Sequence, residues 1–317
     1  MLTLFTCPKP FKGHIEIIQR NAIVSWTRLR PAPQIVLLGD EAGAAEVCRS
    51  LGLRHVPDIA CNEFGTPLLN DVFEQAHQCA FHKLMAFVNT DIILMSDFMA
   101  AVEHVSQAMR RFLLLGQRWD VDIQEPVDFE TEKWEIRLRE YAERTRPPGP
   151  LWGLADYFVF PKGALGELPP FTVGRTAWDN WLIYRARALR LPVIDATPRV
   201  MVIHQKHDYT HQSKQPQGWN DSSLGIESRR NQTLSGGEAY NQFGLADATH
   251  LLTLTALRRA LGWRYLLRHM EAAPILFPWL RSLLWVIRLK KFSARAIAKI
   301  GRVTRAWGRA VSPNRIR

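Results

Sequence analysis

Ala86-Phe87-Val88-Asn89-Thr90-Asp91-Ile92-Ile93-Leu94-Met95 decides the fold class of this chain. Residues 86–88 and 92–95 are apolar, which is typical of a strand covered on both faces. No face of a helix would hide Asn89, Thr90 and Asp91 in such a run, so we predict that they lie at a strand end or a bend. A carboxylate beyond the carboxyl end of a strand can hold a divalent cation against a pyrophosphate. The alternative is an Asp that caps a turn.

Outward from this stretch, strand-like and helix-like segments alternate along the chain, which predicts a doubly wound, mostly parallel α/β sheet. Strands are expected at residues 2–5, 35–38, 112–116, 157–160 and 200–204, and helices at 15–29, 42–51, 69–84, 99–109 and 178–189. Three segments break the pattern, namely an irregular acidic stretch at 120–135, a Pro-Pro-Gly-Pro break at 147–150, and a polar loop at 212–237.

Length and charge divide the chain into two parts. The 317 residues allow two domains, or one large α/β domain with an appendage. Residues 255–317 carry 15 Lys and Arg against the single acid Glu271, or +14, so the net charge of +11 leaves −3 for residues 1–254. We therefore expect a globular domain over 1–250 and a basic amphipathic helical tail over 251–317.

The tail combines basic residues with tryptophans and aliphatic side chains, which suits an anionic membrane surface. Pro274 and Pro278 are expected to divide it into separate helices. Residues 272–287 are too short to span a bilayer and are interrupted by Arg281, so the tail is expected to lie on the membrane. A helical subdomain packed on the core is the alternative. No nucleic-acid partner is expected, because residues 283–287 are more apolar than a phosphate-tracking helix needs.

The four cysteines, Cys7, Cys48, Cys61 and Cys79, form no Cys-x-x-Cys pair. The chain begins with a strand-like run and shows no secretory signal. We therefore expect reduced thiols and a cytoplasmic protein, peripheral to the inner face of the membrane.

Two further carboxylates follow signals for a strand or a helix. Asp40 comes directly after the predicted strand 35–38 and Gly39, where it can accept a hydrogen bond from a nucleobase or a ribose hydroxyl. Asp179, in Gly174-Arg175-Thr176-Ala177-Trp178-Asp179-Asn180-Trp181, is expected in the first turn of a helix between two indoles, where it can act as a general base toward an acceptor hydroxyl. The alternative for each is a helix N-cap.

A histidine cluster follows the predicted strand 200–204. It reads His204-Gln205-Lys206-His207-Asp208-Tyr209-Thr210-His211, with three imidazoles and a carboxylate in eight residues. One imidazole is expected to complete a metal shell. The alternatives are solvated loop histidines, or a zinc site formed by the cluster alone, although the spacing matches no common zinc motif.

The order of these features resembles the nucleotide-diphospho-sugar transferases of the GT-A fold over about residues 1–211. The likeness rests on the strand followed by Thr6-Cys7-Pro8-Lys9-Pro10, the strand ending in Asp40, the triplet at 89–91, and the helix opening with Trp178-Asp179. The family's metal motif is usually Asp-x-Asp; here it reads Asn89-Thr90-Asp91, with only the last carboxylate, which leaves metal dependence open. In the family, an acid at the position of Asp179 acts as base in inverting members, and a late strand contributes a metal ligand, here His204 or His207.

The predicted site follows from the strand ends together with this resemblance. The catalytic base is Asp179, and the metal ligands are Asp91, His204 and His207, for Mn²⁺ or Mg²⁺. The donor-binding residues are Thr6, Pro8, Lys9, Asp40, Asn89, Thr90 and Asp91. The acceptor-binding residues are Arg118, Trp119, Asp120, Asp156, Trp178 and Asn180.

The function expected from this site is transfer of a sugar from a nucleotide-diphosphate donor to a hydroxyl of a glycan or lipid-linked acceptor, at the cytoplasmic face of the membrane. The alternatives are a non-catalytic membrane-docking protein with the same fold, and a zinc hydrolase that uses residues 204–211. A sugar-nucleotide pyrophosphorylase is disfavoured, because Thr6-Cys7-Pro8-Lys9-Pro10 lacks the glycines of a triphosphate-binding loop.

Overall fold

The computed structural model describes residues 1–145, 155–207 and 225–280. The chain divides into two compact units, Met1–Tyr265 and Leu266–Arg317. The strands are β1 (Leu2–Thr6), β2 (Gln34–Leu38), β3 (Arg54–Val56), β4 (Leu84–Val88), β5 (Ile92–Ile93), β6 (Leu113–Leu115), β7 (Arg118–Val121), β8 (Tyr157–Pro161), β9 (Val193–Asp195), β10 (Val202–Gln205), β11 (His250–Leu252) and β12 (Leu257–Arg259). The α-helices are α1 (Gly13–Thr27), α2 (Ala44–Leu51), α3 (Leu69–Cys79), α4 (Ser96–Ala108), α5 (Trp134–Thr145), α6 (Trp178–Ala188), α7 (Ile226–Leu234) and α8 (Trp263–Leu276).

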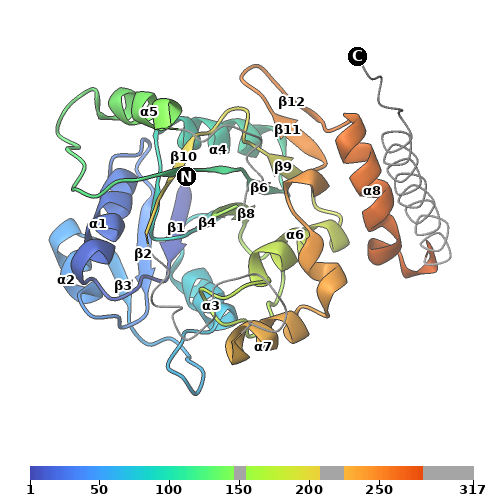
Figure 1. The fold of residues 1–317 in the computed structure, drawn as a ribbon, viewed down its shortest axis with the longest axis horizontal. Coiled ribbons are helices and arrows are strands. Elements are labelled where there is room, and N and C mark those ends of the chain that lie inside the picture. The colour runs from blue at the N-terminus through green and yellow to red at the C-terminus, as the bar shows by residue number, and fades with distance from the viewer. Residues whose placement is uncertain (146–154, 208–224, 281–317) are drawn as a thin grey trace, which may run out of the picture. The chain divides into compact units, whose positions relative to one another are not determined.

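A nine-stranded sheet in the order β12-β11-β9-β6-β8-β4-β1-β2-β3 forms the centre of the first unit (Figure 1). Most neighbouring strands are parallel, and β8 runs antiparallel to both β4 and β6. The expected α/β class with a mostly parallel sheet is therefore confirmed.

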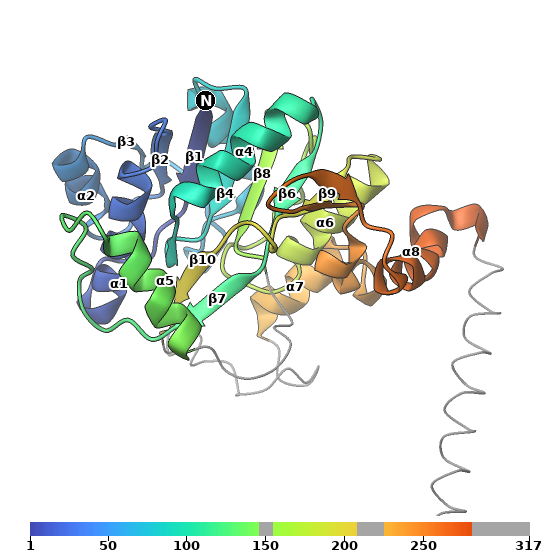
Figure 2. The same cartoon turned by 90° about the horizontal axis from the view of Figure 1, so that it is seen from above.

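Helices cover both faces of this sheet, because successive strand residues point to opposite sides. Leu2, Leu4, Ala86 and Val88 pack in one core cluster with residues of α1, α2 and α4. Phe5, between Leu4 and Thr6, faces the other way and meets Phe73 of α3 edge-to-face. Figure 2 shows α4 crossing one face of the strands, while α3 and α6 lie on the other side in Figure 1. The sheet is thus doubly wound, as predicted.

A smaller sheet in the order β5-β10-β7 lies beside the main one. The expected strand at 200–204 is β10, which pairs in this second sheet and not in the large one. Its apolar residues pack with Leu138 and Ala142 of α5. The small sheet carries four of the expected site residues, Arg118, Trp119, Asp120 and His204.

Several local expectations are wrong. The stretch 120–135 is not wholly irregular, because β7 extends to Val121 and α5 begins at Trp134. The helix expected over 69–84 ends at Cys79, where Ala80 turns extended before β4. Within the expected loop 212–237, Ile226–Leu234 is helix α7, while the break at 147–150 lies outside the described residues.

The C-terminal region also differs from expectation. Strands β11 and β12 extend the main sheet through β9, and the first unit ends at Tyr265, beyond the expected boundary at residue 250. Pro274 lies inside α8 and does not end it. Among the described residues, no helix is long and apolar enough to cross a bilayer. The four cysteines are free thiols, as expected.

Candidate active site

The site forms where β1, β2 and β4 end and β8 begins. Because β8 is antiparallel to β4, Val88 pairs with Tyr157, and the residues just beyond them meet at the same edge. The Asn89 amide nitrogen donates to the Asp156 carbonyl at 3.0 Å, and the Asn89 side-chain amide donates to Oδ1 of Asp156 at 2.8 Å. Asn89, which stands where the family motif has its first acid, therefore binds a carboxylate of its own chain.

Asp91, His204 and His207 come together at this edge, and we call them the Asp-His-His triad. The pairing of β10 places His204 opposite Asp120 of β7 and Ile92 of β5, next to Asp91. Nε2 of His207 lies 3.1 Å from Oδ2 of Asp91, and Nε2 of His204 lies 3.6 Å from the same oxygen. One potential ligand atom from each of the three residues lies within 4.8 Å of the others.

Two of these groups have opposing pKa shifts with a common cause. Burial alone would raise the pKa of Asp91, but contacts with His204 and His207, and the charge of Lys9, hold it well below its usual range. Burial alone would lower the pKa of His204, yet contacts with Asp120 and Asp91 raise it to about 9. The imidazole of His204 is therefore a cation between two carboxylates when no metal is bound.

The triad fits a divalent cation. Oδ1 of Asp91 is buried and has no hydrogen-bond partner in the described part of the chain. Nδ1 of His204 lies 2.7 Å from Oδ1 of Asp120, but neither atom makes a hydrogen bond of good geometry there. A carboxylate oxygen with two imidazole nitrogens suits Mn²⁺ or Zn²⁺ better than Mg²⁺, which prefers oxygen ligands.

Arg118 joins the triad to the other half of the site. Its Nε lies 3.0 Å from Oδ1 of Asp120, and its Nη1 donates to Oδ2 of Asp156 at 2.9 Å. Burial raises the pKa of Asp156, and the charge of Asp91 adds to this effect while Arg118 opposes it. Arg118 thus holds two carboxylates in place, and its contact with an acceptor stays a prediction.

Asp179 stands in the first turn of α6, as expected. The N-cap of α6 is Ala177, so the capping alternative for Asp179 is wrong. Burial raises the pKa of Asp179 to about 6, helped by the charge of Asp156, while backbone hydrogen bonds and Arg118 oppose the shift. At neutral pH its carboxylate is ionised but remains basic enough to accept a proton.

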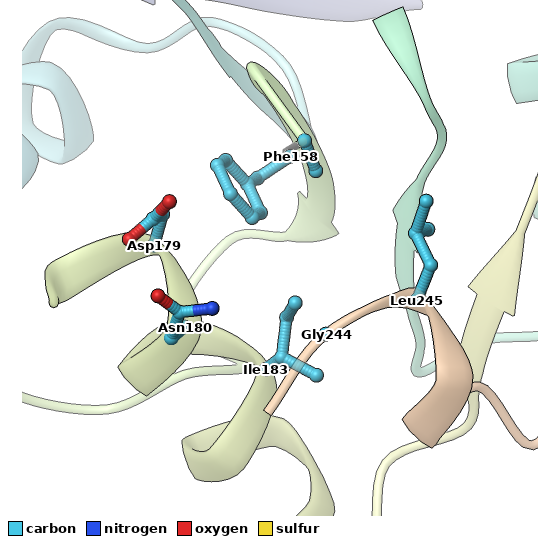
Figure 3. Close-up of a pocket in the computed structure, with 7 residues that line it drawn as sticks. Phe158, Asp179, Asn180, Ile183, Gly244 and Leu245 are labelled. Carbon is cyan, nitrogen blue, oxygen red and sulfur yellow. The ribbon is translucent and has the colours of Figure 1, made fainter. Parts of the chain in front are cut away.

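A small recess adjoins Asp179 (Figure 3). Its walls are mostly apolar, and Asn180 fixes one side by donating to the carbonyl of Phe243 at 2.6 Å. The volume of about 20 Å³ has room for about one water molecule. The lining residues are Ala155, Phe158, Asp179, Asn180, Ile183, Gly244 and Leu245.

Lys9 lies near Asp91 and near a second cation, Arg175. Burial lowers the pKa of Lys9, the charge of Asp91 opposes this, and the charge of Arg175 lowers it further, so the three groups are close enough to interact. Among the described residues Lys9 has no ion pair, whereas Arg175 pairs with Glu227 of α7 at 2.6 Å. The sequence analysis included Lys9 but missed Arg175, which lies five residues before Asn180 in the segment already considered for Asp179.

A buried amide network holds the triad from behind, and sequence reasoning missed it. Gln205 is fully buried, and both its backbone nitrogen and its side-chain amide donate to the carbonyl of Asp91, at 3.1 and 3.2 Å. The same side-chain amide also donates to Ile18 of α1, and Asn21 of α1 donates to Oε1 of Gln205 at 3.0 Å. Gln205 therefore fixes the backbone of Asp91 against the strand that carries His204.

The remaining predicted donor residues lie at or near the same edge. Thr6 ends β1, and its buried hydroxyl has no hydrogen-bond partner among the described residues. Pro8 is buried, and Thr90 contacts the carbonyl of Cys7 at 3.5 Å. Asp40 is exposed after β2; it does not cap α2, whose N-cap is Gly43.

Of the predicted acceptor residues, Trp178 and Asp156 are buried, and the ring of Trp178 packs edge-to-face on Phe87. Trp119 is half-buried in β7. Asp208 and His211 of the histidine cluster lie outside the described residues. Binding roles for the predicted residues stay predictions, while their gathering at one edge is observed for Thr6, Asp91, Asp156 and the two histidines.

No family model matches the chain, and no curated protein matches its sequence. Among solved structures, residues 1–349 of TarS from S. aureus, in complex with UDP-GlcNAc, match with 10% identity over 66% of this chain and 60% of that chain, at a TM-score of 0.44. Glucosyl-3-phosphoglycerate synthase from Mycobacterium tuberculosis, in complex with phosphoglyceric acid, matches with 12% identity over 82% of this chain and 86% of that chain, at a TM-score of 0.45. The same synthase with Mg²⁺ and UDP gives 12% identity, coverages of 75% and 80%, and a TM-score of 0.43.

The chain spans about 60% of the length of the TarS chains that it matches. These likenesses concern the arrangement of helices and strands alone. At identities of 10–12% they assign no role to any residue of this chain.

Proposed function

We propose that the protein is a glycosyltransferase that moves a sugar from a nucleotide-diphosphate donor to an acceptor hydroxyl. The observation that carries this proposal is a pair of carboxylates that both interact with Asp156: Asp91 is kept ionised beside two imidazoles, and the pKa of Asp179 is raised to about 6. The pairing of Arg118 with Asp120 and Asp156 links the two environments. Two acids with opposite shifts suit two different tasks in one reaction.

The donor diphosphate is assigned to the Asp91 side. Asp91, His204 and His207 would hold a divalent cation, which supplies positive charge to the leaving diphosphate. Lys9 adds positive charge near Asp91, and Arg175 lies close enough to Lys9 to interact with it. The Lys9 ammonium, which has no ion pair among the described residues, would contact a phosphate oxygen. The neighbouring complexes with UDP and Mg²⁺ or Mn²⁺ make a uridine diphosphate donor with such a cation the first choice to test.

The acceptor is assigned to the Asp179 side. Asp179 takes the proton of the attacking hydroxyl, which is the role of a general base in an inverting transfer. Asp156 and Arg118, which pair with each other, interact electrostatically with Asp179, and Asp156 also interacts with Asp91 and His204 of the triad. A glycan or a lipid-linked sugar is the proposed acceptor class. The proposed location of the protein is the cytoplasmic face of the membrane, which the net charge of +14 over residues 255–317 supports.

The test is a thermal-shift series with UDP-, GDP-, CDP- and dTDP-sugars, with and without Mn²⁺. We expect one base class to stabilise the protein, and Mn²⁺ to enlarge that shift, because a ligand that binds only the folded state raises its stability. Asp91→Asn should abolish the Mn²⁺-linked part, and the matched variant Asp97→Asn, which removes a carboxylate that pairs with Arg139 outside the site, should keep it.

No shift with any nucleotide sugar would leave the proposal without its donor and would favour a non-catalytic docking protein with this fold. A shift that is insensitive to Mn²⁺ and to Asp91→Asn would remove the metal from the proposal. It would leave the transferase reaction to Lys9, Arg175 and Asp179.

A second candidate function is a zinc hydrolase, favoured by one observation: two imidazoles and a carboxylate form a donor set that also suits zinc, with positions left for water. Metal analysis of the purified protein separates the two functions. Stoichiometric zinc that survives dialysis, together with no response to nucleotide sugars, would favour the hydrolase.

A further inference from the structure

Helix α8 carries an exposed apolar stripe. Trp263, Leu266, Leu267 and Met270 are 73%, 40%, 42% and 56% exposed. Their spacing of three, four and seven residues places them on one face of the helix. The stripe is about 10 Å long at the rise of an α-helix. A helix of a soluble protein normally turns such a face toward its core, so this stripe needs a partner.

The other side of the same helix is the more covered one. Ala272, half a turn away from the line of the stripe, is fully buried, and Tyr265 and His269 are half-buried. The apolar stripe is therefore the exposed face of α8. Scattered exposed apolar residues are common on proteins, but four in register along one helix are a surface of a defined kind.

The charge near the stripe is positive. Arg264 is exposed beside it, and the acid Glu271 is matched by Arg268 at 3.6 Å. The sequence that follows the described part of the chain, residues 281–317, contains 11 Lys and Arg and no Asp or Glu. A partner of this region must accept apolar side chains and a tryptophan while carrying negative charge.

We propose that the α8 stripe contacts an anionic lipid bilayer and holds the protein on its surface. An amphipathic helix with aliphatic residues and a tryptophan on one face and arginines at its flank lies in the plane of the interface, with the apolar side chains among the acyl chains. Anionic head groups satisfy the arginines. The inference extends the proposed transferase by naming its surface partner, but vesicle binding itself does not depend on transferase activity.

The test uses the full-length protein and co-sedimentation with vesicles of phosphatidylcholine, alone or mixed in equal parts with phosphatidylglycerol. We expect binding to the mixed vesicles and little binding to phosphatidylcholine alone. The stripe variant Leu266→Ser/Leu267→Ser/Met270→Ser should bind the mixed vesicles at least about tenfold more weakly, because each substitution removes apolar area from the contact.

A matched control has the same number of exposed apolar residues removed elsewhere. Phe81, Ile136 and Leu254 are 83%, 55% and 73% exposed and lie outside α8. The variant Phe81→Ser/Ile136→Ser/Leu254→Ser should bind mixed vesicles like the unaltered protein. If the stripe variant loses its cooperative thermal transition, the single variant Met270→Glu replaces it, with the same expected direction.

Three results would overturn the inference. The first is failure of the unaltered protein to sediment with either vesicle, and the second is binding of the stripe variant as tight as that of the control. A change in oligomeric state of the stripe variant, with unchanged vesicle binding, would show that a second copy of the chain covers the stripe. The nucleotide-sugar thermal shift, measured on the same preparations without vesicles, reports separately on the proposed transferase.

Discussion

Asp91 and Asp179 are the same amino acid and both interact with the charge of Asp156, yet their surroundings shift their pKa values in opposite directions. Asp91 lies beside two imidazoles and within reach of the charge of Lys9, which hold its pKa well below the usual range. Asp179 has apolar neighbours and the charge of Asp156, and its pKa rises to about 6. The surroundings of each carboxylate, and not its residue type, therefore set the direction of its pKa shift.

The largest expected effect comes from removing the proton acceptor. Asp179→Asn keeps the shape of the side chain but not its basicity, so turnover should fall about 10²- to 10⁴-fold while donor affinity stays within about twofold. Initial rates and donor titrations measure the two quantities. Asp195→Asn is the matched control, because Asp195 is a buried carboxyl group with a raised pKa outside the site. The Asp195→Asn variant should keep the turnover of the unaltered protein. Loss of donor binding by Asp179→Asn would move Asp179 to the donor side of the comparison.

Removing the other carboxylate should act on binding. Asp91→Asn leaves His204 and His207 without their shared partner and should weaken Mn²⁺-linked donor binding by roughly 10- to 100-fold. Isothermal titration with donor at fixed Mn²⁺ gives the affinity. An unchanged affinity, with turnover reduced as in Asp179→Asn, would mean that the two carboxylates do not divide the work.

The pH dependence of the rate should report Asp179. Below pH about 6 its carboxyl group is protonated and cannot accept a proton, so the turnover number should fall about tenfold per pH unit as pH drops. Above that pH this group is ionised and adds no further increase. Turnover measured at saturating donor between pH 5 and 8 tests the point, and Asp179→Asn should lose the inflection. An inflection that persists in the variant would belong to another group.

A smaller effect is expected from the support behind Asp91. Gln205→Leu keeps the volume of the side chain but removes its hydrogen bonds with Asp91, Ile18 and Asn21. Mn²⁺ affinity should therefore fall about tenfold, and the free energy of unfolding should fall by about 1–3 kcal/mol. The control is Gln34→Leu, which removes a side-chain amide that is hydrogen-bonded to Thr3 and Cys79 at the end of β2 away from the site. It should lower stability without changing Mn²⁺ affinity. Equal Mn²⁺ affinities in the two variants would make Gln205 a structural residue only.

The smallest effect concerns the entry to α6. Ala177 has a φ of 86°, a left-handed conformation that costs a residue with a Cβ about 1–2 kcal/mol. Ala177→Gly should relieve that strain and change the free energy of unfolding by at most about 1 kcal/mol, since glycine also gains freedom in the unfolded chain. Denaturant titration measures this change. A large loss of turnover without a loss of stability would show that the fixed turn positions Asp179.

The sequence predicted the parts of the fold that depend on local patterns. Apolar runs marked β1, β2 and β4, and amphipathic spacing marked α1, α2 and α6. Strands β3, β9, β11 and β12 were missed because three residues give no measurable alternation. Strand β7 and helix α7 were missed because Arg118–Val121 and Ile226–Leu234 are largely polar, and tertiary contacts stabilise them.

The site was predictable where a residue follows a strand. Asp91 and His204 were found because a polar residue after an apolar run signals a strand end. The pairing of Arg118 with Asp156, the approach of Arg175 to Lys9, and the bonds of Gln205 to α1 all join segments far apart in the chain. No periodicity or spacing carries that information, because the pairing of strands in space decides it.

The antiparallel direction of β8 relative to β4 and β6 determines which end of β8 contributes a side chain to the site. A strand that ends at the edge of the sheet near the site places its last residue there. A strand that begins at this edge places its first residue there. If β8 were parallel to its neighbours, Asp156 would lie at the opposite edge of the sheet, about 16 Å away over the five residues of the strand. Because β8 is antiparallel to β4, Asp156 precedes its strand and still lies at the same edge of the sheet as residues that follow theirs. This placement gives Arg118 a second carboxylate to bind.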